Sequence, residues 1–126
     1  MKNRTVKVIG IAAALAAFSA PALADGDADA GKKVFNKCKA CHTLDEGKNK
    51  VGPTLFGVFG RSAAAVPGFK YSKALKGAGL TWDDETMEKF LAKPKDLVPG
   101  TRMAFAGLKK DDDIENVIAY IKANGG

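Results

Sequence analysis

The clearest apolar pattern in the chain lies near its C-terminus. Between an acidic start at 111–113 and a glycine pair at 125–126, apolar residues recur at i, i+3, i+4 and i+7: Ile114, Val117, Ile118 and Ile121. This spacing places all of them on one face of a helix. We therefore predict a closing helix with one buried face.

Two further stretches show helical spacing. In the first, Asp27 or Asp29 can cap a helix that we expect to run to about Ala40. In the second, Thr81 is the expected cap and Pro94 the expected end, because proline cannot continue a helix. Their predicted buried faces are Val34, Phe35, Cys38 and Cys41 in the first and Met87, Phe90 and Leu91 in the second. A short helix is also expected over 71–76.

The stretches 43–70 and 95–110 show neither a helical nor a strand period and are rich in glycine and proline. Loops of this length are uncommon in a small domain unless they are functional or wrap around something. The sequence therefore predicts an all-α fold with three main helices, short helices and long loops around a large apolar group.

The N-terminal segment has the features of a secretory signal peptide. A basic start precedes a 13-residue apolar run, 8–20, and the small residues Ala22 and Ala24 flank Leu23 at the expected cleavage site. The run is shorter than the roughly 20 residues that cross a bilayer. We expect residues 1–24 to be cleaved, which leaves one domain, 25–126, in the periplasm; the alternative is an uncleaved anchor.

Composition limits the classes of function. Loss of residues 1–24 lowers the Lys+Arg count from 20 to 17 against 14 Asp+Glu, so the net charge falls from +6 to +3. This mild basicity argues against a nucleic-acid-binding protein, which usually carries a stronger basic stripe or patch. A chain of this size also buries a modest core, which an apolar cofactor would enlarge.

All cysteine and histidine in the chain lies in one short motif. Cys38 and Cys41 are three positions apart, and His42 follows directly. This C-x-x-C-H spacing is typical of covalent haem c attachment, in which the thiols hold the haem and the histidine is an axial iron ligand. One haem c per chain is expected.

Three alternatives fit the motif less well. A zinc site needs about four ligands, and no further Cys or His exists. A thioredoxin-like dithiol requires a βαβ unit, for which strand patterns are missing. A structural disulfide is allowed in an exported protein but explains neither the adjacent histidine nor the long loops.

The second axial ligand can be a methionine. Met87 lies at helical spacing with Phe90 and Leu91, which favours core packing, whereas Met103 follows a Pro-Gly-Thr turn in an irregular stretch. We therefore prefer Met103. Ligation by His42 and Met103 would close both axial positions and raise the reduction potential, which favours electron transfer over gas binding or catalysis.

Several segments together resemble class I cytochromes c, and in particular the bacterial cytochromes c2. They are 31–35, 38–43, 51–61, 67–72, 79–82, 99–107 and 112–120, and they cover nearly all of the chain after residue 24. The resemblance implies the class I cytochrome c fold. It also implies a single-haem electron carrier between a membrane quinol-oxidising complex and a terminal oxidase, reaction centre or reductase.

The resemblance also assigns roles to residues. The Pro53 carbonyl would accept a hydrogen bond from His42, and the haem propionates would lie near Arg61, Tyr71, Trp82 and Thr101. Basic residues around the haem edge would dock transiently with acidic redox partners, the carrier being a monomer outside the membrane. These docking residues are Lys33, Lys37, Lys50, Lys95, Arg102, Lys109 and Lys110.

Phe90 departs from the family pattern, since many members have a tyrosine there whose hydroxyl reaches the methionine sulfur. Loss of that hydrogen bond favours one alternative function. If the Met103 side opens, the chain would be a haem enzyme or a gas-binding protein, such as a peroxidase or a nitric-oxide-handling protein.

Overall fold

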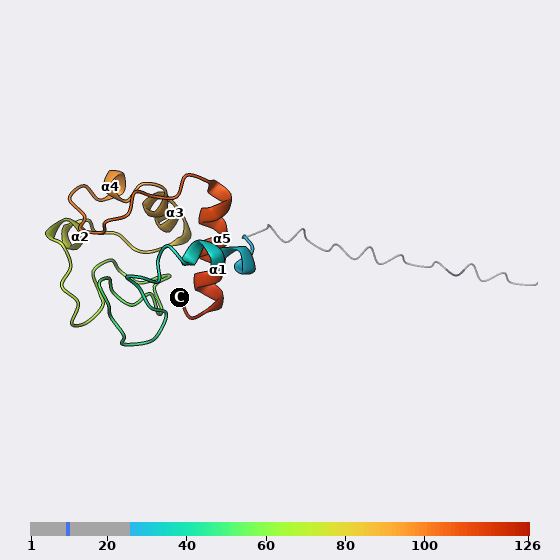
Figure 1. The fold of residues 1–126 in the computed structure, drawn as a ribbon, viewed down its shortest axis with the longest axis horizontal. Helices are drawn as coiled ribbons and strands as arrows, with labels where there is room; N and C mark the ends of the chain where they lie inside the picture. Colours follow the sequence, from blue (N-terminus) through green and yellow to red (C-terminus); the bar gives the residue numbers. More distant parts are fainter. Residues whose placement is uncertain (1–9, 11–25) are drawn as a thin grey trace, which may run out of the picture.

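The computed structural model describes residue 10 and residues 26–126. The predicted signal peptide, apart from Gly10, and its cleavage boundary lie outside the described residues. Figure 1 shows long loops at the lower left of the domain, most of the helices towards the top and right, and one short helix at the left edge. The helices are α1 (Ala28–Phe35), α2 (Lys73–Gly77), α3 (Asp84–Ala92), α4 (Pro94–Leu97) and α5 (Asp111–Ala123). Within the described residues the only β-pairing is an isolated bridge between Ser62 and Thr81, which confirms the all-α prediction.

Helix α1 is shorter than predicted. The Asp27 carboxylate accepts the Asp29 N–H and caps the helix, which ends at Phe35 rather than near Ala40. After Phe35 the backbone bonds change: Cys38 N–H donates to the carbonyl three residues back, at 2.8 Å, as in a 3₁₀ turn. The chain then continues in tight turns to Cys41. The motif therefore lies on turns that follow the helix.

The start of α3 also differs from the prediction. Asp83, not Thr81, caps the helix, and its carboxylate accepts the Thr86 N–H at 2.7 Å. Thr81 is instead engaged in the bridge with Ser62. Pro94 ends α3, as predicted, but it also begins the single turn of α4, because a proline at the first helical position loses no hydrogen bond. The stretch 95–110 is therefore not wholly irregular.

Helices α1 and α5 cross at close range (Figure 1). The predicted apolar face of α5 is buried, and Val117 at its centre is fully inaccessible. Gly31 makes the crossing possible, because a Cβ there would overlap the Asn116 carbonyl and lie 2.8 Å from the Tyr120 Cβ. The Phe35 and Tyr120 rings pack nearby with centroids 5.2 Å apart. The crossing fixes one end of the domain.

The loop 43–70 folds against this helical frame. Gly47, Gly57, Gly60 and Gly68 adopt positive φ, which turns the chain repeatedly. Gly60 N–H donates to the Trp82 carbonyl at 2.8 Å, and Gly57 N–H to the Gly125 carbonyl at 2.7 Å. These bonds join the loop to the start of α3 and to the C-terminus. The described helices include none that is long and apolar enough to cross a membrane.

Candidate functional site

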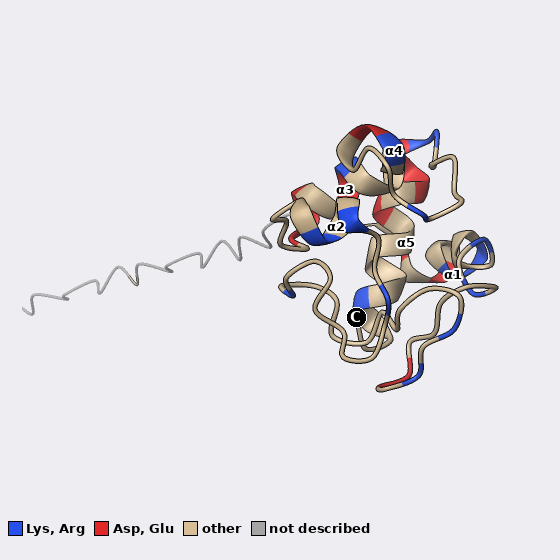
Figure 2. Ribbon diagram, turned by 90° about the vertical axis from the view of Figure 1, so that its left-hand side faces the viewer, with Lys and Arg blue, Asp and Glu red and all other residues tan. Residues whose placement is uncertain are grey.

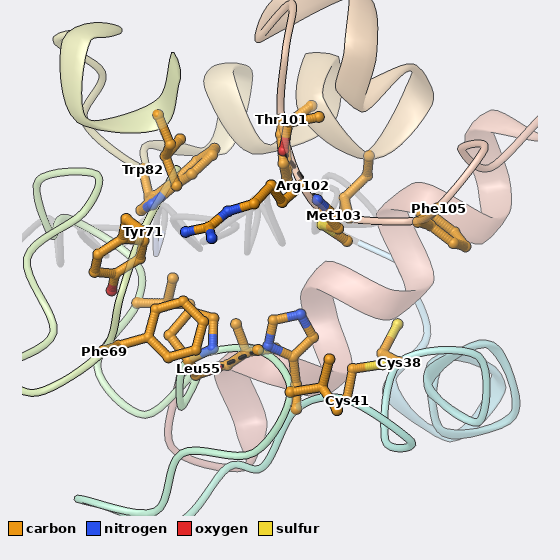
Figure 3. Close-up of a pocket in the computed structure, with 18 of the residues that line it drawn as sticks. Cys38, Cys41, Leu55, Phe69, Tyr71, Trp82, Thr101, Arg102, Met103 and Phe105 are labelled. Atoms are coloured by element: carbon orange, nitrogen blue, oxygen red, sulfur yellow. Dashed lines mark hydrogen bonds between the residues drawn. The ribbon is translucent and has the colours of Figure 1, made fainter. Parts of the chain in front are cut away.

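A largely apolar cavity of about 560 Å³ lies between the helices and the long loops. Its size is in the range of small-molecule and cofactor sites. Figure 3 shows Cys38 and Cys41 on one wall, Met103 and Thr101 on the opposite wall, and Tyr71 and Trp82 at one end. All of the predicted cofactor-binding residues line the cavity: Cys38, Cys41, His42, Pro53, Arg61, Tyr71, Trp82, Thr101 and Met103.

The His42 ring is held on two sides. Its Nδ1 lies 2.7 Å from the Pro53 carbonyl oxygen. Because a carbonyl only accepts, Nδ1 carries the proton and Nε2 keeps a free lone pair. Gly52 packs against the ring, since a Cβ there would lie 2.7 Å from Nδ1. Burial lowers the His42 pKa, and the Pro53 bond opposes this only in part. The ring is therefore neutral near pH 7, as metal ligation requires.

The two thiols occupy different environments. Cys38 is half-buried and Cys41 is exposed, and no disulfide joins them. Burial raises the pKa of the Cys38 thiol, although the neighbouring Lys37 ammonium favours the thiolate. In the part of the chain that the structure describes, no group of three or more His, Cys, Asp or Glu side chains could hold a metal ion. The site therefore does not match a protein zinc centre.

The opposite wall belongs to the segment that follows α4. Gly100 has a φ of 87°, and Thr101 N–H donates to the Val98 carbonyl at 3.0 Å, which closes the turn before Met103. The Met103 N–H lies 3.3 Å from the Thr101 hydroxyl. Met87 and Phe90, both buried on α3, also line the cavity. Met87 packs in the core, as predicted, but it borders the cavity as well.

One end of the cavity presents unused polar groups. Arg61 donates through Nη1 to the Phe56 carbonyl at 2.9 Å and through Nη2 to the Thr54 carbonyl at 3.2 Å. Its Nε–H is buried without a protein partner. Burial lowers the Arg61 pKa, an effect that Tyr71 opposes. The Tyr71 hydroxyl accepts the Val66 N–H at 3.0 Å, so its own proton remains available to donate.

These features fit a haem. The apolar walls suit a macrocycle, the two thiols border it, and His42 has a lone pair available for the iron. The orphaned Arg61 Nε–H would be satisfied by an anionic group, such as a carboxylate of the macrocycle. The residues that would hold the group are therefore all present around one cavity.

The predicted docking residues are all exposed but differ in position. Lys37 and Arg102 line the cavity. Two of the cations donate to backbone carbonyls: Lys50 Nζ to Lys39 at 2.8 Å and Arg102 Nη2 to Lys70 at 2.8 Å. Figure 2 shows Lys and Arg spread over loops and helices rather than gathered on one element. Those that do not line the cavity are Lys33, Lys50, Lys95, Lys109 and Lys110.

Sequence reasoning missed several cavity residues. Lys70 is exposed and borders the cavity, and its only sequence signal was its place after the Pro-Gly-Phe turn. The apolar lining was also missed, because most of it lies in loops and one residue in the five-residue helix α2, where no period reveals it. These lining residues are Leu55, Val58, Phe69, Leu75 and Phe105.

Comparison with known proteins identifies the family of this chain. The sequence model of the family described as cytochrome c matches residues 28–124. The chain is 53% identical over 96 residues to "cytochrome c2 iso-2" of Magnetospirillum molischianum, which covers 76% of this chain and 96% of that protein. It is 52% identical over 97 residues to "cytochrome c-550" of Nitrobacter winogradskyi, which covers 76% and 89%.

A solved structure is similar as well. Cytochrome cH from Methylobacterium extorquens superimposes with a TM-score of 0.74 at 48% identity, covering 78% of this chain and 99% of that chain. This likeness confirms the predicted class I cytochrome c fold, and the family implies covalently bound haem c at the C-x-x-C-H motif. The chain therefore belongs to the cytochrome c family, as a class I, cytochrome c2-like carrier of electrons with haem c.

Proposed function

We propose that this chain is an exported, monomeric electron carrier whose haem iron is ligated by His42 and Met103. It takes electrons from a membrane quinol-oxidising complex and gives them to a terminal acceptor, such as an oxidase, a reaction centre or a reductase. One observation carries the proposal: His42 and Met103 line the same cavity from separate segments, and Met103 lies across it from the two cysteines (Figure 3).

The haem supplies a one-electron couple when it is bound. The chain supplies a fixed environment for that couple. His42 donates through Nδ1–H to Pro53, which fixes the ring and makes Nε2 a stronger ligand. Buried side chains such as Val58, Leu91 and Val117 keep water out of the cavity. A dry and preorganised site needs little rearrangement when a charge changes nearby.

The polar end of the cavity would neutralise carboxylates. The Arg61 guanidinium is held by two backbone carbonyls and still has its Nε–H free. The Tyr71 proton adds a second donor. Buried carboxylates are costly without such partners, so we assign Arg61 and Tyr71 to the haem propionates, with Trp82 and Thr101 beside them.

Export to the periplasm follows from the N-terminal signal. The basic start, apolar run and small-residue cleavage site of residues 1–24 support it. Bacterial cytochrome c2 relatives at about 50% identity are consistent with this location. N-terminal sequencing of the holoprotein tests the boundary: we expect Asp25 as the first residue, and an intact Met1 would instead support the anchor.

The absorption spectrum of the purified ferric holoprotein tests the ligands. Iron–methionine bonding gives a weak band at the red edge of the visible spectrum, and we expect this band at neutral pH. A spectrum without the band, together with immediate binding of added cyanide or imidazole, would contradict the proposal. That result would favour a haem enzyme or a gas-binding protein, in which Phe90 offers no hydroxyl to the methionine sulfur.

A further inference from the structure

In the part of the chain that the structure describes, Thr54 is the one buried residue whose side chain is polar without being aromatic, with 5% of its surface exposed. Its hydroxyl donates to the Asp45 carbonyl at 2.6 Å and accepts the Phe56 N–H at 3.1 Å. Its own N–H donates to the Asn49 side-chain oxygen at 2.9 Å. Every polar group of Thr54 is therefore engaged, since its carbonyl accepts from Arg61.

Thr54 lies between the hydrogen bond that fixes His42 and the one that fixes Arg61. The carbonyl before it, that of Pro53, accepts from His42 Nδ1 at 2.7 Å. Its own carbonyl accepts from Arg61 Nη2 at 3.2 Å. Thr54 therefore connects the backbone that bonds to His42 with the backbone that bonds to Arg61.

Because the peptide bond is planar, a hydrogen bond to its N–H also fixes the direction of its carbonyl. In a trans peptide, the carbonyl of one residue and the N–H of the next lie in one plane and point in opposite directions. The Pro53 carbonyl and the Thr54 N–H share such a plane, so the bond to Asn49 on one side aims the carbonyl at His42 on the other.

The next plane is fixed in the same way. The Thr54 carbonyl shares it with the Leu55 N–H, which donates to the Thr43 carbonyl at 2.9 Å. The Thr54 hydroxyl anchors the residue that joins the two planes, because it donates to the Asp45 carbonyl on the preceding loop and accepts the Phe56 N–H beyond. A rotation of either plane would therefore strain a buried hydrogen bond.

We propose that Thr54 is a positioning residue of the electron-transfer site: its hydroxyl anchors the residue at which the two peptide planes meet, and so holds the Pro53 carbonyl against His42 and the Thr54 carbonyl against Arg61. This inference rests on the proposed function, in which His42 is an iron ligand. Thr54 acts through these two residues and sets the reduction potential by their placement.

The test compares Thr54→Val with Thr54→Ser in the full holoprotein. Valine keeps the shape and removes the hydroxyl, whereas serine keeps the hydroxyl. The readouts are the midpoint potential and the solvent exchange of the His42 Nδ1 proton, followed by NMR in the reduced state. We expect Thr54→Val to shift the potential and to speed exchange roughly tenfold, as loss of buried hydrogen bonds allows local opening. Thr54→Ser should restore both.

Thr43→Val is the matched control. The Thr43 hydroxyl donates to the Lys48 carbonyl at 2.6 Å and contacts the Asp45 backbone, but it bonds to neither Pro53 nor Arg61. The substitution therefore loosens the same loop while it keeps the Thr54 hydroxyl and the Thr43 carbonyl. It should leave both readouts close to those of the unmodified protein. If Thr54→Val fails to accumulate as holoprotein, Thr54→Ala makes the same deletion with less bulk.

Two results would overturn the inference. In one, Thr54→Val lowers thermal stability but leaves the potential and the exchange rate unchanged. In the other, Thr43→Val produces the same changes as Thr54→Val, which would mean that any loosening of the loop suffices. Failure of the proposed function is a separate outcome, because it would appear in the unmodified protein as a missing methionine band.

Discussion

His42 and Met103, on separate segments that line the cavity, are fixed by different numbers of contacts. His42 is constrained by the Pro53 carbonyl, by contact with Gly52, and by the Gly52 N–H, which donates to the Cys41 carbonyl at 2.8 Å. Met103 is partly exposed, and the bonds that hold it engage its backbone: its N–H lies 3.3 Å from the Thr101 hydroxyl, and its carbonyl accepts the Phe105 N–H at 2.9 Å. Under the proposed ligation, the methionine ligand should therefore be lost before the histidine.

Replacement of the thioether is the most direct check of the proposed ligands. Met103→Ala should abolish the weak red-edge band and markedly lower the midpoint potential, because the thioether favours the ferrous state. The measurements are the ferric absorption spectrum and a redox titration. Met87→Leu is the control: it conserves volume at a buried position, and such exchanges usually cost less than about 1.5 kcal/mol. If Met87→Leu removes the band and Met103→Ala does not, the ligand assignment is wrong.

At the scale of elements, local patterns were predictable and long-range pairing was not. The apolar face of α5 could be predicted from spacing alone, whereas the C-x-x-C-H motif, predicted at the end of a helix, lies on the turns that follow α1. Thr81 is as good a cap by type as Asp83, and only the bridge to Ser62, nineteen positions away, decides between them. Similarly, Lys70 reaches the cavity through loop turns that leave no period in the sequence. The hydrogen bond from the Arg102 guanidinium to the Lys70 carbonyl also depends on how these loops fold.

The α1–α5 crossing gives a prediction on stability. Gly31→Ala should lower the free energy of unfolding by about 1–3 kcal/mol, because the added methyl overlaps the Asn116 carbonyl and forces the helices apart. Thermal or denaturant unfolding of the holoprotein measures the loss.

The control for this prediction is the same substitution in α2. A Cβ at Gly77 would meet nothing within 4 Å, and alanine is favoured over glycine in a helix by roughly 0.5–1 kcal/mol. Gly77→Ala should therefore be neutral or stabilising. Equal losses at the two positions would show that helix contact is not the cause.

The cap of α3 gives a pH dependence. Hydrogen bonds from the Thr86 side chain and then from its backbone N–H lower the Asp83 pKa below its ordinary value. The folded state therefore prefers the ionised carboxylate. Its stabilising contribution is present above the unfolded pKa, near 3.9, and is lost as the pH falls through the lower folded value.

Asp83→Ala should consequently lower the melting temperature at pH 7, and the difference from the unmodified protein should shrink as the pH falls below about 4. Circular dichroism melts across this range measure the effect. Asp83→Ala has a matched control in Asp83→Asn, since asparagine caps a helix without ionising. The difference in melting temperature between Asp83→Asn and Asp83→Ala should therefore vary less with pH than that between the unmodified protein and Asp83→Ala. A difference between Asp83→Ala and the unmodified protein that is the same at every pH would contradict the assignment.

At the scale of the whole molecule, the expected docking residues differ in their position relative to the cavity. The family resemblance gave seven cations, of which only Lys37 and Arg102 border the cavity, and the structure adds Lys70. Arg102 is already bonded to the Lys70 carbonyl. If an acidic partner approaches the cavity, as proposed, we expect Lys37 and Lys70 to contribute most to guiding it, because both border the cavity.

Charge reversal with small redox reagents tests this arrangement without knowledge of the natural partner. Lys37→Glu and Lys70→Glu should slow oxidation of the ferrous protein by anionic hexacyanoferrate(III) roughly threefold or more at low salt, because the local field no longer attracts the reagent. Reduction of the ferric protein by cationic hexaammineruthenium(II) should respond in the opposite direction. Both effects should fade above about 0.15 M salt, where charges beyond about 8 Å are screened.

Lys48→Glu is the matched control for these variants, because Lys48 lies 4.0 Å from Asp45 on an exposed loop and does not line the cavity. All three variants change the net charge by the same amount. A larger change of rate for Lys37→Glu or Lys70→Glu than for Lys48→Glu would therefore come from the position of the charge. If Lys48→Glu slows the anionic reagent as much as they do, only the overall charge matters. Electron transfer would then lack a preferred edge, and the seven cations would be scattered surface charges.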